Sequence, residues 1–300
     1  PRRGVALHIN AFNFPVWGMM EKLAPTLLAG MPAIIKPASS TARLTELAVA
    51  YMIDSGVLPA GALQLICGRT GDIFDHLTCQ DIVTFTGSAT TAHYLQSHPN
   101  LTKNSIPFVA ECDSLNASIL GADAAAGSPE FDLFVKEVVR EMTVKAGQKC
   151  TAIRRVIVPR SLAADVKDAV ASSLAKIVVG DPRAEGVRMG PLASLEQRKE
   201  VIERVNDLRN YCDVILDGTG EFEVVGGEYS AGAFIKPTLL YCDNPLETKA
   251  VHGIEAFGPA STIMPYDTTE EAIKLANMGE GSLVASLFTF DPEIVSEVVM

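Results

Sequence analysis

The chain has 300 residues, of which 48% are hydrophobic and 20% are charged. This composition permits a sizeable core, arranged as two domains or one large α/β unit, and it argues against disorder. The net charge of -11 argues against nucleic-acid binding, because phosphate recognition needs clustered Lys and Arg. Apolar runs stay short of the roughly 20 residues that span a bilayer, so we expect no membrane partner.

Cysteine usage indicates reduced thiols. The six cysteines form no C-x-x-C pair, so we expect no metal site. Two of them lie in strand-like apolar runs and no secretory signal is visible, which favours a cytoplasmic protein. The chain starts at Pro1 and ends at Met300 inside a helical pattern, so we expect an internal piece of a longer protein.

In the first part of the chain, short apolar runs alternate with helical patterns. This alternation predicts a parallel sheet covered on both faces. The strand-like runs are 5–9, 33–36, 63–67 and 82–85, and the helical patterns are 16–29, 41–54, 71–78 and 88–96.

The pattern changes after about residue 113. An apolar stripe predicts one helix over 130–145. The order of the later segments indicates a second α/β domain, with strands at 153–158, 213–216, 238–242 and 284–290 and helices at 161–177, 194–211 and 292–300. We therefore expect two domains, 1–113 and 114–300.

The most informative segment is Ala146-Gly147-Gln148-Lys149-Cys150-Thr151, just after the long helical pattern. Glu111 lies upstream, at the end of a short apolar run. A thiol and a carboxylate in one pocket would suit covalent catalysis, in which the thiolate attacks and the carboxylate handles protons or water. The alternatives are a buried structural cysteine and a solvated or paired glutamate.

Five motifs occur in a fixed order over nearly the whole chain: Asn13-Phe14-Pro15, Ile35-Lys36-Pro37-Ala38, Phe85-Thr86-Gly87-Ser88, Gly147-Gln148-Lys149-Cys150 and Glu255-Ala256-Phe257-Gly258-Pro259. Together they resemble the aldehyde dehydrogenase superfamily. The local sequence around Asn13, Glu111 and Cys150 resembles that of the aldehyde dehydrogenase domain of the bifunctional ring-opening protein of phenylacetate degradation. The semialdehyde dehydrogenase of the benzoyl-CoA epoxide pathway is similar.

The resemblance implies a fold and a mechanism. The fold would be an α/β fragment of the aldehyde dehydrogenase type: a doubly wound, Rossmann-type NAD(P)-binding domain at 1–113, incomplete at its N-terminus, and an α/β catalytic domain at 114–300, incomplete at its C-terminus. Cys150 would be the nucleophile, Glu111 the general base that hydrolyses the thioester, and Asn13 an oxyanion donor. Many relatives carry two glycines shortly after this glutamate, where this chain has Cys112-Asp113-Ser114.

The same resemblance assigns the cofactor residues. Lys36 would contact the adenosine ribose, Gly87 and Ser88 the pyrophosphate, and Glu255 and Phe257 the nicotinamide ribose and ring. Relatives that prefer NAD often carry a glutamate three residues after the lysine, where this chain has Ser39. A serine leaves room for a 2′-phosphate and removes a repelling charge, so we expect NADP, with NAD possible. Each assignment has a purely structural alternative. Lys36 could be an ordinary surface lysine, the segment 85–88 a turn that caps a helix, and the segment 255–259 a tight turn rich in Gly and Pro.

The implied reaction is oxidation of an aldehyde, expected to be a coenzyme-A-linked semialdehyde from aromatic catabolism, to a carboxylic acid. The implied partners are further copies in a homo-oligomer and a fused hydratase-like domain. Two rivals stay open: acyl transfer to coenzyme A, against which Glu111 argues, and a non-catalytic assembly domain.

Overall fold

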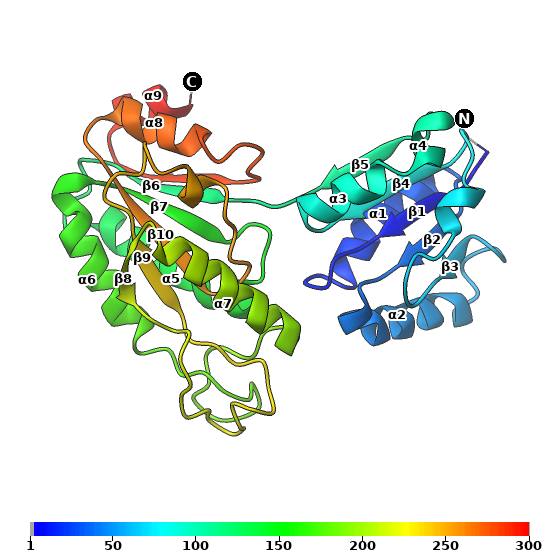
Figure 1. Cartoon of the computed structure of the whole chain (residues 1–300), viewed down its shortest axis with the longest axis horizontal. Coiled ribbons are helices and arrows are strands. Elements are labelled where there is room, and N and C mark those ends of the chain that lie inside the picture. Colours follow the sequence, from blue (N-terminus) through cyan, green and yellow to red (C-terminus); the bar gives the residue numbers. More distant parts are fainter. Residues whose placement is uncertain (1–2, 300) are drawn as a thin grey trace. The chain divides into compact units, whose positions relative to one another are not determined.

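The computed structural model describes residues 3–299. The chain divides into two compact units, Pro1–Asp113 and Ser114–Met300 (Figure 1). Each unit has a sheet and hydrophobic clusters of its own. Between residues 3 and 299, no helix is long and apolar enough to cross a membrane.

The first unit is a five-stranded sheet in the order β3-β2-β1-β4-β5, and every neighbouring pair is parallel. Parallel neighbours require crossover connections, which the helices supply. The strands are β1 (Ala6–Ile9), β2 (Ala33–Lys36), β3 (Leu63–Leu65), β4 (Ile82–Thr86) and β5 (Phe108–Glu111). The helices are α1 (Trp17–Leu28), α2 (Ala42–Asp54), α3 (Ala89–Gln96) and α4 (Pro99–Lys103).

Both faces of this sheet are covered, because alternate residues of its short strands point to opposite sides. Leu7 and Val83 pack toward α3 and α4. Ala33 and Ile35 pack toward α1 and α2. The helix predicted at 71–78 was wrong: only a single 3-10 turn, Ile73–His76, forms there.

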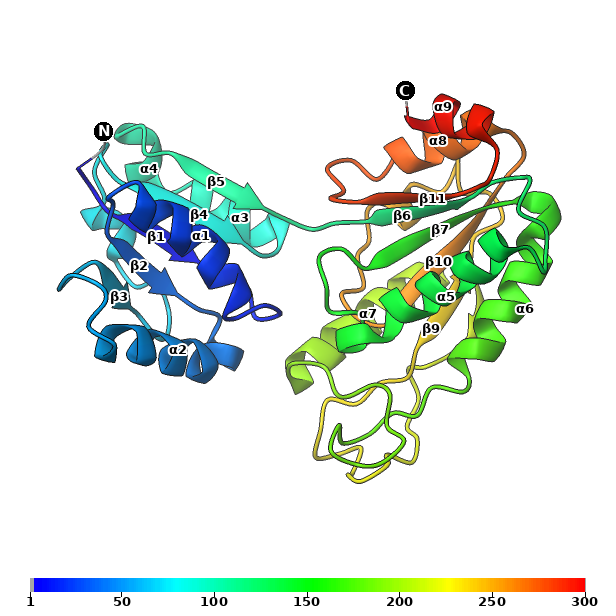
Figure 2. The same cartoon turned by 180° about the vertical axis from the view of Figure 1, so that it is seen from behind.

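The second unit contains a six-stranded mixed sheet in the order β11-β6-β7-β10-β9-β8. Only β8 runs antiparallel to its neighbour, β9, at the edge of the sheet. The strands are β6 (Asn116–Leu120), β7 (Ile153–Pro159), β8 (Asp213–Leu216), β9 (Thr238–Tyr241), β10 (Ala260–Tyr266) and β11 (Ala285–Phe288). The helices are α5 (Pro129–Thr143), α6 (Ala163–Leu174), α7 (Leu195–Arg209), α8 (Thr269–Asn277) and α9 (Pro292–Val299). Figure 2 shows α5 and α6 on the face of this sheet that is turned toward the viewer.

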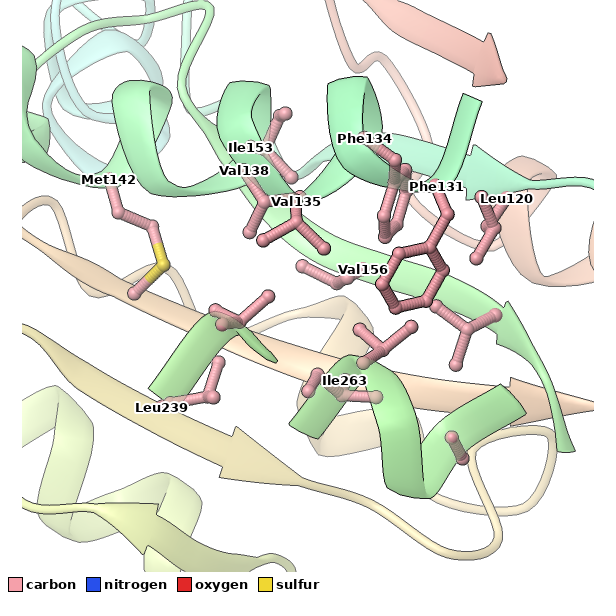
Figure 3. Close-up of a cluster of buried hydrophobic side chains, with 14 of the residues drawn as sticks. Leu120, Phe131, Phe134, Val135, Val138, Met142, Ile153, Val156, Leu239 and Ile263 are labelled. Carbon is pink, nitrogen blue, oxygen red and sulfur yellow. The ribbon is translucent and has the colours of Figure 1, made fainter. Parts of the chain in front are cut away.

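Helix α5 leads directly to the segment that carries Cys150. Ser128 caps its first turn by accepting a hydrogen bond from the Phe131 N–H at 3.2 Å, and Pro129 occupies the first turn, where its missing N–H costs nothing. The predicted apolar stripe is buried, with Phe134 and Val138 fully shielded from solvent. These side chains interlock with residues of β7, β9 and β10 (Figure 3). The packing fixes the end of α5 against the sheet.

Candidate functional site

The side chains of interest in the first unit follow the carboxyl ends of its parallel strands. Lys36 ends β2, Glu111 ends β5, Asn13 lies in the loop after β1, and Gly87 follows β4. Backbone hydrogen bonds tie these ends together: the Asn10 N–H donates to the Lys36 carbonyl at 3.0 Å, and the Gly87 N–H donates to the Glu111 carbonyl at 3.1 Å. The strand order reverses between β1 and β4, which is where open α/β sheets bind ligands.

The turn after β4 leads into α3. Gly87 is required by packing, because a Cβ there would lie 2.7 Å from the ring of Phe85. Ser88 is the N-cap and accepts a hydrogen bond from the Thr91 N–H at 3.3 Å. The carboxylate of Asp113 accepts another from the Ala89 N–H at 3.1 Å. The first turn of α3 therefore already attracts a negative group, as helix N-termini do.

Lys36 and Ser39 lie on either side of the turn after β2. The Lys36 ammonium donates to the Pro37 carbonyl at 3.0 Å, and partial burial lowers the pKa of this lysine. Ser39 is exposed and begins a 3-10 turn, Ser39–Thr41. A hydroxyl at an exposed turn adds no charge to this part of the edge.

A lysine that the sequence analysis missed lies at the same edge. The Lys22 ammonium, on α1, donates to the side-chain oxygen of Asn10 at 3.2 Å and to the hydroxyl of Thr86. Burial lowers the pKa of Lys22, and the negative charges of Glu21 and Glu111 oppose that shift. A cation is thus held among the ends of β1, β4 and β5. The signal was available: Lys22 interrupts the apolar face of α1 beside buried Met19 and Leu23.

In the second unit, Cys150 follows a turn of unusual backbone conformation. Helix α5 ends at Thr143, and then Lys145, Ala146 and Gly147 adopt φ values of 55°, 52° and 69°. This left-handed region costs about 1–2 kcal/mol for each residue that has a Cβ. Gly147 is obligatory for a second reason, since a Cβ there would lie 2.6 Å from the carbonyl carbon of Gly258.

Two side chains fasten the segment around Cys150. The Asn116 amide, at the start of β6, donates to the carbonyl of Cys150 at 2.7 Å and to that of Ala152 at 3.0 Å. The buried Gln148 side chain accepts from the Ala193 N–H at 2.8 Å and donates to the carbonyl of Phe257 at 3.3 Å. The backbone on both sides of the thiol is therefore fixed.

The guanidinium of Arg154, which is 4% exposed, connects the cysteine segment to the Glu255–Gly258 segment. It donates to the carbonyl of Gly147 at 2.7 Å and to that of Gly258 at 2.6 Å. It also forms an ion pair with Glu255 at 3.6 Å and lies 5.3 Å from the ring centre of Phe257. Burial lowers the pKa of Arg154, and Glu255 opposes that shift. Three of the sequence-predicted residues, Cys150, Glu255 and Phe257, thus belong to one connected network.

Two cationic side chains lie near Cys150. Both Lys145 and Arg154 interact electrostatically with Cys150. The neighbouring Lys149 ammonium is bound instead by the Glu141 carboxylate, at 2.7 and 2.8 Å. Cationic neighbours favour the thiolate, which is the nucleophilic form of cysteine. The described residues contain no group of three or more His, Cys, Asp or Glu side chains placed to hold a metal ion.

Comparison with known proteins identifies the family. Residues 1–299 match the model of the aldehyde dehydrogenase family. The chain belongs to the aldehyde dehydrogenase family. It is 50% identical over 299 residues to 3,4-dehydroadipyl-CoA semialdehyde dehydrogenase from Aromatoleum evansii, a match that covers 100% of this chain and 58% of that protein.

The names of two further relatives specify a nicotinamide cofactor. A D-glyceraldehyde dehydrogenase (NADP(+)) from Picrophilus torridus is 28% identical over 98% of this chain and 58% of its own length. A solved structure of betaine aldehyde dehydrogenase from Staphylococcus aureus in complex with NAD+ has a TM-score of 0.86 and 26% identity, and the match covers 99% of this chain and 57% of that one. The chain thus spans less than two thirds of the length of these relatives. The α/β fold of the aldehyde dehydrogenase type that the sequence predicts is confirmed.

The residues present fit a nicotinamide dinucleotide, the cofactor bound by relatives in this family. The carboxyl edge of the first sheet offers the Lys36 ammonium and the first turn of α3. Within the described chain, the buried amide nitrogen of Asn10 has no hydrogen-bond partner, so one polar donor near this edge is unsatisfied. Asp113 is the acidic neighbour that a pyrophosphate at α3 would meet.

Proposed function

We propose that this chain carries the cofactor-binding and catalytic parts of an NADP-dependent aldehyde dehydrogenase that converts a coenzyme-A-linked semialdehyde to its acid. The proposal rests on the contacts that fix the backbone around Cys150. Its segment is held in a strained left-handed turn by Asn116, Gln148 and Arg154, as expected for a side chain whose position matters for chemistry. A structural cysteine would need no such support.

The substrate proposal rests on the 50% identical relative, whose name specifies 3,4-dehydroadipyl-CoA semialdehyde. The resemblance to ring-opening proteins points to the same class, a semialdehyde from aromatic catabolism. The reduced cysteines agree with a cytoplasmic enzyme, and we propose a homo-oligomer. A fused hydratase-like domain stays part of the proposal.

The proposed roles divide between the two units. Cys150 adds to the aldehyde carbonyl, and the Asn13 amide with a backbone N–H stabilises the oxyanion that forms. A bound nicotinamide dinucleotide supplies the hydride acceptor. Glu111 then takes a proton from water, which attacks the Cys150 thioester and releases the carboxylic acid.

The cofactor roles follow the same division. In the first unit, Lys36 and Ser39 bind the adenosine ribose and its 2′-phosphate, while Gly87 and Ser88 face the pyrophosphate. In the second, Glu255 and Phe257 orient the nicotinamide ribose and ring, and Arg154 holds both of them. We propose residues 1–113 as the NAD(P)-binding domain and residues 114–300 as the catalytic domain.

The test is a rapid-mixing experiment on the full-length protein with Glu111→Gln. Loss of a general base costs about 10²–10⁴ in rate, so hydride transfer should outrun hydrolysis. We expect a burst of reduced cofactor near one equivalent per site and an acyl mass on Cys150. Undiminished steady turnover would remove Glu111 as the base, and Asp113 would be tested next.

Acyl transfer to coenzyme A is the second candidate. Free coenzyme A added to the parent enzyme distinguishes it, because a transferase releases an acyl-CoA product in place of the acid. Failure of every semialdehyde and other aldehyde tested, with either cofactor, would favour the assembly-domain alternative.

A further inference from the structure

Two cysteines outside the proposed site face each other across the edge of the second sheet. Strand β8 pairs antiparallel with β9, with Asp213 opposite Tyr241 and Val214 opposite Leu240. Continuing this register by one residue places Cys212 opposite Cys242. Directly opposed residues in antiparallel strands have Cα atoms about 4.5–5.5 Å apart, inside the range of about 4.4–6.8 Å that disulfides require.

The side chains confirm what the register indicates. Cys242 is buried, Cys212 is half-buried, and both belong to the same hydrophobic cluster. The two thiols lie close enough to shift each other's pKa. The Cys212 thiol, together with Thr248 and the Asn244 backbone, lowers the pKa of Cys242 to about 7 against burial and the charge of Asp243, and the proximity of Cys242 raises the pKa of Cys212. The pairing therefore places two sulfurs side by side and favours ionisation of Cys242 over Cys212.

We propose that Cys212 and Cys242 form a redox modification site, closed to a disulfide by hydrogen peroxide. The Cys242 thiolate attacks one peroxide oxygen, the O–O bond breaks, and hydroxide leaves to give a sulfenic acid. The Cys212 sulfur then attacks the Cys242 sulfur, so that the S–O bond breaks, the S–S bond forms, and the hydroxyl leaves as water with the Cys212 proton. In sum, two thiols and one peroxide give one disulfide and two waters.

The disulfide would tie the edge strand β8 to the interior of the sheet and close the chain between residues 212 and 242. Cross-links that close long loops restrict the unfolded chain most. The segment between β8 and β9 contains the Phe222–Tyr229 ring pair, on which Arg198 and Lys236 rest. Oxidation should therefore stabilise the second unit without using Cys150.

Tryptic digestion separates this cysteine pair from Cys150. Trypsin cuts after Arg209 and Lys249 and spares the Lys236–Pro237 bond, so both cysteines lie in one peptide, 210–249. Cys150 lies in another, 150–154. After peroxide treatment of the full-length protein and alkylation, we expect peptide 210–249 to lack two hydrogens and carry no label. Cleavage at Glu221, Glu223 or Glu228 should leave its two halves linked until reductant is added.

Thermal unfolding provides a second readout. Oxidation should raise the Tm of the parent protein by roughly 5–10 °C. It should leave the Tm of Cys212→Ser unchanged, while the control Cys79→Ser, at an exposed cysteine, should respond like the parent. Two alkylated thiols in peptide 210–249 at a peroxide dose that already oxidises Cys150 would overturn the proposal. So would a sulfinic or sulfonic acid on Cys242, or a cross-link from either cysteine to peptide 150–154.

Discussion

Replacing Arg154 by Met tests whether the cysteine segment depends on its long-range contacts. Met has similar length and no charge, so Arg154→Met keeps much of the buried volume. It removes the donors to the Gly147 and Gly258 carbonyls and the cation beside Glu255, whose side chain is 10% exposed.

The loss of stability in Arg154→Met follows mainly from the buried Glu255 carboxylate, which loses its ion pair with Arg154. Breaking one side of a buried ion pair costs about 3–5 kcal/mol. The carbonyls of Gly147 and Gly258 add little to this, because each keeps a backbone donor, the N–H of Lys149 and the N–H of Ala260. In a unit of this size each kcal/mol lowers Tm by about 2–4 °C, so the expected fall is roughly 6–20 °C. Displacement of the Cys150 segment by about 1 Å should also lower kcat on the order of 100-fold.

The assay is thermal unfolding of the full-length protein, with steady-state kinetics and iodoacetamide labelling of Cys150 well below the transition. Arg160→Met is the matched control, because Arg160 makes comparable ion pairs with Asp243 and Asp267 at the surface. Exposed pairs are worth only about 0–1 kcal/mol, so its Tm should barely move. A Tm for Arg154→Met within about 2 °C of the parent, with normal labelling of Cys150, would refute the reasoning.

Three other changes probe separate parts of the proposed site. Cys150→Ala should abolish aldehyde oxidation and leave dinucleotide affinity nearly unchanged by calorimetry, and more than trace turnover would exclude Cys150 as the nucleophile. Ser39→Glu should shift kcat/KM from NADP toward NAD by placing a carboxylate against the 2′-phosphate, an argument that fails if the parent already prefers NAD. Gly147→Ala should lower the free energy of unfolding, measured in urea, by more than about 1–2 kcal/mol, because Ala must adopt φ of 69° and its Cβ would overlap the Gly258 carbonyl. Gly186→Ala is its control, since φ there is 81° but nothing lies within 4 Å of the added Cβ, so equal costs would leave no role for the overlap.

Much of the first unit was predictable, because its information is local. Short apolar runs separated by helical patterns specify a parallel sheet, and Lys36 and Glu111 end strands as their positions in the sequence indicate. The failures were also local. The segment 71–78 forms only a single 3-10 turn, Ile73–His76, because apart from Leu77 its residues are weak helix formers. Strand β10 was missed because polar residues and Pro265 mask a segment that is buried at every position.

The surroundings of Cys150 were not predictable from the sequence in the same way. Arg154 and Arg155 look like interruptions of an apolar strand, whereas both are buried and belong to β7, whose pairing with β6 shifts register at Arg154. Their partners are remote: Gly258 lies 104 residues beyond Arg154, and Leu275 lies 120 residues beyond Arg155. No periodicity within a window of a few turns can report a contact at that separation.

The strained turn before Cys150 shows why this matters for function. Lys145 and Ala146 adopt a left-handed backbone conformation, which is unfavourable for residues that have a Cβ. The conformation persists because Arg154 and Gln148 bind the turn to the Phe257–Gly258 backbone and Asn116 binds the far side of the thiol. Strain held by surrounding contacts pre-positions a reacting group. Two segments far apart in sequence therefore have to fold together before Cys150 is placed, which couples the geometry of the proposed nucleophile to that of the residues proposed to orient the nicotinamide.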